Sequence, residues 1–155
     1  AALGYDTFTG LQAAAVFSQA GAALGVFLKT KDKEMKGISA SAAITGLFGI
    51  TEPAIYGVNL RLKRPMICGC IAGAVGGAVA GAFRAVSWGY NMPGIATLPA
   101  YFKAGHMSQF TGLLLSVLIA FVLGIVLTYI AGLKEEAAEV GMRKAENWLL
   151  RLPGM

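Results

Sequence analysis

A single acidic residue lies inside a long apolar segment, beside residue types that interrupt helices. Residues 49–57 read Gly-Ile-Thr-Glu-Pro-Ala-Ile-Tyr-Gly, and Glu52 is the only acidic residue between Glu34 and Glu135. A carboxylate at membrane depth is costly to insert, so such a group usually marks a substrate or ion site. The position of Glu52 therefore predicts a transport site.

The neighbours of Glu52 predict how the chain presents it. Pro53 lacks a backbone donor and disfavours helical backbone at Glu52 itself. Gly49 and Gly57 loosen the chain on either side. Residues 37–60 are therefore expected to form two short helical halves, with the acid in the irregular break between them. Non-helical backbone at this depth is tolerated only where it is buried in protein or lines a wet cavity.

The composition is that of an integral membrane protein. Of the 155 residues, 56% are hydrophobic and only 14% are charged, against roughly 25% charged in soluble domains. The net charge of +5 comes from basic clusters beside apolar runs, which the positive-inside rule explains without nucleic-acid binding. The sequence contains no nucleotide-binding loop, metal-ligand cluster or nucleophile–base pair. We therefore expect no cofactor, no metal and no catalytic residue in this chain.

The apolar runs define the expected elements. Three charge-free runs can each span a bilayer: residues 11–28, 66–83 and 110–133. Residues 37–60 have basic clusters at both ends, which favours a re-entrant hairpin, although their length also permits a single span. Residues 134–155 mix charged and apolar side chains, as in a cytoplasmic amphipathic helix. The expected fold is an all-α integral membrane protein, with a transport domain over residues 1–133.

Small and polar residues predict which helix faces meet protein. Gly69-x3-Gly73 and Gly77-x3-Gly81 are small-xxx-small patterns, which let helix backbones approach closely. In the first apolar run, Ser18 and Gln19 are poorly suited to lipid. Their face is expected to pack on protein or to line the transport pathway.

Residues 49–65 closely resemble the signature of enzyme IIC permeases of the phosphotransferase system, in the β-glucoside, sucrose and trehalose branch of the glucose superfamily. Residues 20–31 resemble the same branch, and the resemblance covers most of residues 5–133. It implies a multi-pass protein of the bacterial inner membrane that imports a sugar while a phosphorylated enzyme IIB domain phosphorylates it. The chain would then be part of a protein-Nπ-phosphohistidine–sugar phosphotransferase, although it should not be catalytic alone.

The resemblance also implies site residues and partners. Glu52 matches the glutamate that binds sugar hydroxyls, and the expected substrate-binding set is Glu52, Thr51, Gly49, Ile50 and Asn59. The basic loops are expected to dock the phosphorylated partner through Lys31, Lys33, Arg61, Lys63 and Arg64, although positive-inside anchoring explains each of them equally well. The chain has about half of a typical enzyme IIC. It is expected to act with the rest of that domain, as a homodimer in the bilayer.

Two other functional interpretations fit the same residues. In a secondary transporter or channel, Glu52 would bind a proton or cation, because broken helices and intramembrane acids serve such proteins too. A non-transporting fragment would only pack with other membrane chains. Uptake that is driven by a proton gradient, without phosphorylation, would distinguish the transporter.

Overall fold

The computed structural model describes residues 6–88, 92–103 and 105–131, and these residues are helical with no strand among them. The elements in chain order are α1 (Thr7–Lys29), α2 (Lys33–Leu47), the π-helix η1 (Pro53–Asn59), α3 (Leu60–Leu62), α4 (Arg64–Ala82), the 3-10 helix η2 (Ile95–Tyr101) and α5 (Met107–Ala131). Helices α1, α4 and α5 are each long and apolar enough to cross a membrane, which confirms the three expected spans. The expected amphipathic helix over residues 134–155 lies outside the described residues.

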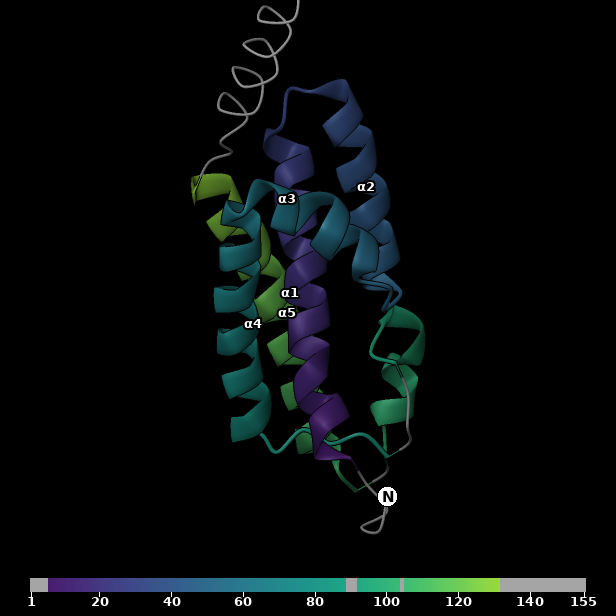
Figure 1. Cartoon of the computed structure of the whole chain (residues 1–155). Helices are drawn as coiled ribbons and strands as arrows, with labels where there is room; N and C mark the ends of the chain where they lie inside the picture. Colours follow the sequence, from purple (N-terminus) through teal and green to yellow (C-terminus); the bar gives the residue numbers. More distant parts are fainter. Residues whose placement is uncertain (1–5, 89–91, 104, 132–155) are drawn as a thin grey trace, which may run out of the picture.

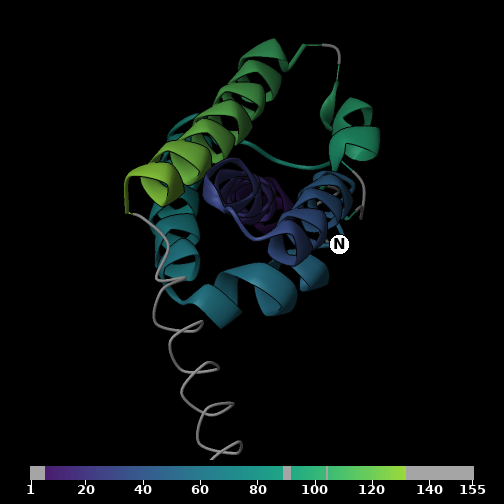
Figure 2. The same ribbon diagram turned by 90° about the horizontal axis from the view of Figure 1, so that it is seen from above.

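Helix α1 is the centre of the molecule. It packs against α5, α4, α2 and η1, and Figure 2 shows it surrounded by them. Its buried residues are mostly small, so neighbouring helices reach its backbone. Ser18 and Gln19 are among the buried residues, so their face packs on protein, as expected.

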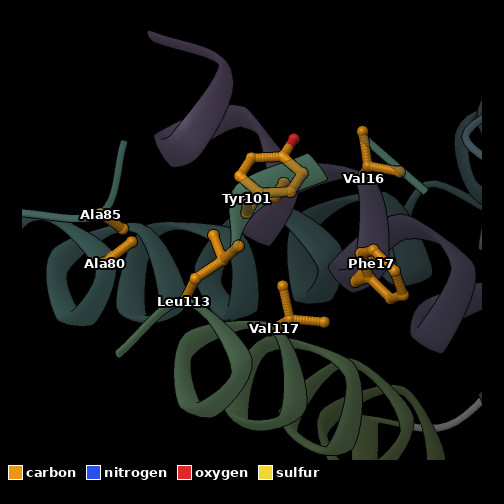
Figure 3. Close-up of a cluster of buried hydrophobic side chains, with 8 residues drawn as sticks. Val16, Phe17, Ala80, Ala85, Tyr101, Leu113 and Val117 are labelled. Atoms are coloured by element: carbon orange, nitrogen blue, oxygen red, sulfur yellow. The ribbon is translucent and has the colours of Figure 1, made fainter. Parts of the chain in front are cut away.

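A cluster of apolar side chains joins α1 to the segment that follows α4. Phe17 of α1, Leu113 of α5 and Tyr101 of η2 meet there with the other residues labelled in Figure 3. Only 2% of the surface of Tyr101 is exposed, and burial, together with the negative charge of Asp6, raises the pKa of Tyr101 to about 12. The phenol therefore stays neutral, and it anchors η2 against α1 and α5.

Basic side chains tie the helix ends together at one end of the molecule. Lys29 Nζ donates a hydrogen bond to the carbonyl oxygen of Tyr129 at 2.5 Å, and Arg64 Nη1 donates one to that of Ala131 at 2.8 Å. The last carbonyls of a helix lack intrahelical donors, and cations near them also complement the helix dipole. The end of α1, the start of α4 and the end of α5 thus share one end of the bundle, at the top of Figure 1.

Between α1 and α4 the chain turns back on itself. Helix α2 runs away from the basic end, the chain reverses after Leu47, and η1 and α3 return toward the start of α4 while η1 packs on α2 (Figure 1). Both ends of this segment lie at the basic end, which is the arrangement expected of a re-entrant hairpin.

The backbone conformation of Glu52 differs from the one expected from the sequence. Glu52 has helical backbone, with φ −54° and ψ −46°, so the irregular break over residues 48–51 precedes the acid rather than containing it. The steric preference of the residue before proline is overridden here. Pro53 occupies the first turn of η1, where its missing N–H leaves no hydrogen bond unmade. Glu52 therefore begins the second helical half.

Candidate functional site

The break in the hairpin is a tight turn built around Gly49. Gly49 has φ +96°, a left-handed conformation that glycine adopts at little cost. Its N–H donates to Gly46 O at 3.0 Å, and the next N–H, of Ile50, donates to Thr45 O at 3.0 Å. These bonds satisfy the last carbonyls of α2 and turn the chain toward Glu52.

A second segment supports this turn from outside the hairpin. A Cβ on Gly49 would lie 2.7 Å from Pro93 O, and a Cβ on Gly94 would lie 2.7 Å from Phe48 O, so the two backbones are in direct contact. Thr97 holds the second segment in shape, because its hydroxyl accepts from Gly94 N at 3.0 Å and donates to Met92 O at 2.7 Å. The break is thus fixed by residues more than forty positions away.

The break, the start of α1 and the supporting segment enclose a cavity of about 330 Å³. Its lining residues are Asp6, Phe8, Thr9, Gln12, Val16, Gly49, Thr51, Glu52, Met92 and Pro93. This volume is at the lower end of the range for ligand pockets, and such pockets combine apolar walls with a few convergent polar groups.

The polar groups of the cavity suit a neutral polyhydroxyl ligand. Glu52 is exposed, and no partner within the described residues holds its carboxylate, which leaves its oxygens available as hydrogen-bond acceptors. The Gln12 amide and the Thr51 hydroxyl can both donate and accept. No group of three or more potential metal ligands occurs in the described part of the chain.

Asp6 has a different role from Glu52, although both line the cavity. Its carboxylate caps α1 by accepting hydrogen bonds from Phe8 N, at 2.9 Å, and from the Thr9 hydroxyl. The Thr9 hydrogen bond lowers the pKa of Asp6 below its usual value. Asp6 is therefore ionised at neutral pH, and its carboxylate oxygens already accept hydrogen bonds from Phe8 and Thr9. It adds negative charge to the part of the cavity wall that α1 forms.

The structure brings together only part of the residue set expected from the sequence. Gly49, Thr51 and Glu52 line the cavity, whereas Ile50 is half exposed and is not among the lining residues. Asn59 lies at the far end of η1 and is fully buried. Its Nδ2 donates to Gln19 O at 3.1 Å and to Gln19 Oε1 at 2.7 Å, so it fastens η1 to α1.

Replacing Asn59 with alanine should destabilise the protein by about 1–3 kcal/mol, because Gln19 would lose a buried hydrogen-bond partner. The measurement is thermal unfolding in detergent. Ser41→Ala is the matched control, because it removes an exposed side-chain hydrogen bond from α2 and should leave the melting temperature nearly unchanged. An unchanged melting temperature for Asn59→Ala would contradict a fastening role.

Asp6 and Gln12 are among the lining residues that were missing from the set expected from the sequence. Asp6 carries a local signal, since an aspartate just before an apolar run is a typical helix N-cap. Nothing local places either residue beside Glu52, because their contact depends on how α1 packs against the hairpin.

The basic residues expected to dock a partner lie at the other end of the bundle from this cavity. Lys31, Lys33, Arg61 and Lys63 are exposed in and beside the connections at the basic end, whereas Arg64 contacts the end of α5. Lys63 has φ +62°, an uncommon conformation for a residue with a side chain. Their docking role stays a prediction.

The comparisons with known proteins agree on one family. Residues 4–73 match the family model described as "Phosphotransferase system, EIIC". The chain is 44% identical over 93 residues to a β-glucoside-specific EIIBCA component of Dickeya chrysanthemi, covering 60% of this chain and 15% of that protein. It is 47% identical over 116 residues to the Halalkalibacterium halodurans protein of the same name, covering 74% and 18% of the two chains.

A third relative is named for a different sugar. The chain is 40% identical over 119 residues to a probable sucrose-specific EIIBC component of Bacillus subtilis, covering 77% of this chain and 26% of that protein. The chain thus spans about a quarter or less of the length of these three relatives. No solved structure matches it significantly. The chain belongs to the EIIC family of the phosphotransferase system, whose members are multi-pass proteins of the bacterial inner membrane.

Proposed function

We propose that this chain supplies the sugar-binding part of a phosphotransferase-system permease, and that Glu52 is its sugar-binding carboxylate. The observation that carries the proposal is the cavity at the hairpin break, which gathers Glu52 and Thr51 with Gln12 of α1. The names of the relatives favour a β-glucoside or sucrose as the sugar. Trehalose, which the sequence resemblance also suggested, is not among those names.

The chemistry of the cavity supports this proposal. An ionised carboxylate has two oxygens, so Glu52 can accept hydrogen bonds from two neighbouring sugar hydroxyls. Charge-assisted hydrogen bonds of this kind are stronger than those between neutral groups. Thr51 and Gly49, which also line the cavity, would add contacts along the break.

The phosphoryl donor would be a separate domain. The relatives are EIIBC or EIIBCA proteins, which supports an enzyme IIB domain as the partner of this chain. The sugar hydroxyl oxygen would bond to phosphorus as the donor's bond to phosphorus breaks, and the hydroxyl proton would be released. Lys31, Lys33, Arg61 and Lys63 would attract the phosphorylated partner to the basic end. Assembly with the rest of enzyme IIC, and dimerisation, belong to the same proposal.

The test is sugar binding by the permease that carries this segment, with Glu52→Gln compared with the unaltered protein. The substitution keeps the shape of the side chain and one acceptor but removes the charge. Binding of a β-glucoside or sucrose should weaken at least about tenfold, which is roughly 1.4 kcal/mol. Glu34→Gln is the matched control, because it removes an exposed carboxylate at the start of α2.

Two results would contradict the proposal. Unchanged binding by a folded Glu52→Gln protein would reduce Glu52 to a structural role at the start of η1. Sugar uptake that follows a proton gradient and yields unphosphorylated sugar would favour a secondary transporter instead.

A further inference from the structure

A second, larger cavity lies on the other side of the start of α1. It has a volume of about 470 Å³, and its lining residues are Thr7, Leu11, Gly81, Arg84, Ala85, Val86, Trp88, His106 and Gln109. Its lining residues come from the start of α1, the end of α4 and the chain that leads into α5. These helix ends lie at the end of the bundle away from the basic end (Figure 1). The proposed sugar site does not use these residues.

Arg84 occupies a backbone position that favours glycine. It follows α4 with φ +49°, its N–H donates to Gly81 O at 3.0 Å, and the next N–H, of Ala85, donates to Ala80 O at 2.9 Å. This pair of bonds is the Schellman motif, in which the left-handed residue is usually glycine. A residue with a Cβ is strained in this conformation, and such strain concentrates where a side chain has a function. The strained turn presents a guanidinium group to the cavity.

The cavity is positively charged and bordered by aromatic rings. Its nine lining residues include no carboxylate. The rings of Trp88 and His106 are 5.0 Å apart, and Lys103 Nζ lies 3.7 Å from the centre of the Trp88 ring. Tryptophan beside a cation at the end of membrane-spanning helices is typical of the depth at which lipid headgroups lie. Arg84 lines this cavity and Lys103 lies over the ring of the lining residue Trp88, so two cations stand beside it.

One residue that lines the cavity, Gln109, carries an unpaired acceptor. The Oε1 atom of Gln109 is buried and has no hydrogen-bond partner in the described structure. A buried acceptor without a donor is unfavourable, so a ligand that donates a hydrogen bond there would be stabilised. The ligand must then combine an anion for Arg84 with a donor for Gln109, beside the apolar wall made by Leu11 and Val86.

We propose that this cavity binds the headgroup of an anionic phospholipid, with its phosphodiester on Arg84 and a headgroup hydroxyl on Gln109. The phosphate oxygens accept from the guanidinium, which matches their geometry. Phosphatidylglycerol carries both required groups, whereas phosphatidylcholine has the phosphate but no headgroup donor. The proposal is independent of the sugar site, because the two cavities have no lining residue in common.

The test is lipid binding to the detergent-purified protein, titrated with phosphatidylglycerol or phosphatidylcholine and followed by native mass spectrometry. Arg84→Gly removes the guanidinium while relieving the backbone strain, so the variant should fold at least as well as the original protein. It should bind phosphatidylglycerol at least about tenfold more weakly. Gln109→Leu should abolish the preference for phosphatidylglycerol over phosphatidylcholine.

Lys63→Gly is the matched control, because Lys63 is also an exposed cation with positive φ, at the opposite end of the bundle. It should change phosphatidylglycerol binding by less than about twofold, the effect of one screened surface charge. Equal losses in Arg84→Gly and Lys63→Gly would overturn the proposal in favour of diffuse charge attraction. Equal binding of the two lipids by the unaltered protein, or displacement of phosphatidylglycerol by a β-glucoside, would also overturn it.

Discussion

Replacing Gly49 with alanine is expected to collapse the candidate sugar site. The left-handed backbone at Gly49 costs a residue with a Cβ about 1–3 kcal/mol. The new methyl would also lie 2.7 Å from Pro93 O, an atom of the backbone that cannot rotate away. We expect the free energy of unfolding to fall by about 2 kcal/mol or more, and sugar binding to fall at least about tenfold, because the turn aims Glu52 and Thr51.

Gly57→Ala on the same hairpin is the control for this substitution. A Cβ there would contact only Ile38 Cγ2, at an ordinary 3.6 Å, and the backbone is helical. Its stability should change by less than about 1 kcal/mol. Thermal unfolding and sugar titration of both variants form the experiment. If Gly49→Ala and Gly57→Ala behaved alike, the left-handed turn would not be the element that forms the site.

Replacing Gly21 with alanine should have the second large effect, by separating α1 from α5. A methyl at Gly21 would overlap the carbonyl oxygen of Phe121 and lie 3.2 Å from its Cα. The approach is reciprocal, because a Cβ on Gly124 would lie 2.6 Å from Ser18 O. Overpacking of this kind typically costs about 1–3 kcal/mol. A shift of α1 would also displace Gln12 from the wall of the cavity.

Gly77→Ala in α4 is the matched control, because a Cβ there would have no atom of the described structure within 4 Å. It makes the same chemical change in another apolar helix. The expected result is a lowered melting temperature in detergent for Gly21→Ala and a nearly unchanged one for Gly77→Ala. Equal effects would mean that close contact between α1 and α5 contributes little to stability.

The glycine patterns show where sequence reasoning was right and where it failed. Gly69-x3-Gly73 is in close contact with α1, since Cβ atoms there would lie 2.9 Å from Gln19 and 2.8 Å from Ser18. Gly77-x3-Gly81 was expected to pack equally closely, but Gly77 faces open space in the described structure. The close approach of α1 to α5, through Gly21 and Gly124, was not expected. In a membrane, lipid and protein are both apolar, so hydropathy does not reveal which face of a helix meets protein.

The sequence alone determined the membrane class, the three spans and the position of the hairpin. Each of these depends on free energies that add up along neighbouring residues. The transfer of about 20 apolar side chains into the bilayer defines a span, and basic residues such as Arg61 and Lys63 at the end of an apolar run indicate which side of the membrane that end faces. The glutamate–proline motif also located the break to within a few residues, although it misplaced the acid relative to the turn.

Tertiary structure alone decided what surrounds Glu52. Whether Asp6 and Gln12 share its cavity, and whether Asn59 points into it or into α1, depends on contacts between segments far apart in the chain. The backbone of Glu52 likewise followed the packing of η1 rather than the local preference before proline. Local preferences are worth about 1 kcal/mol each, and the summed packing of α1, α2 and η1 outweighs them.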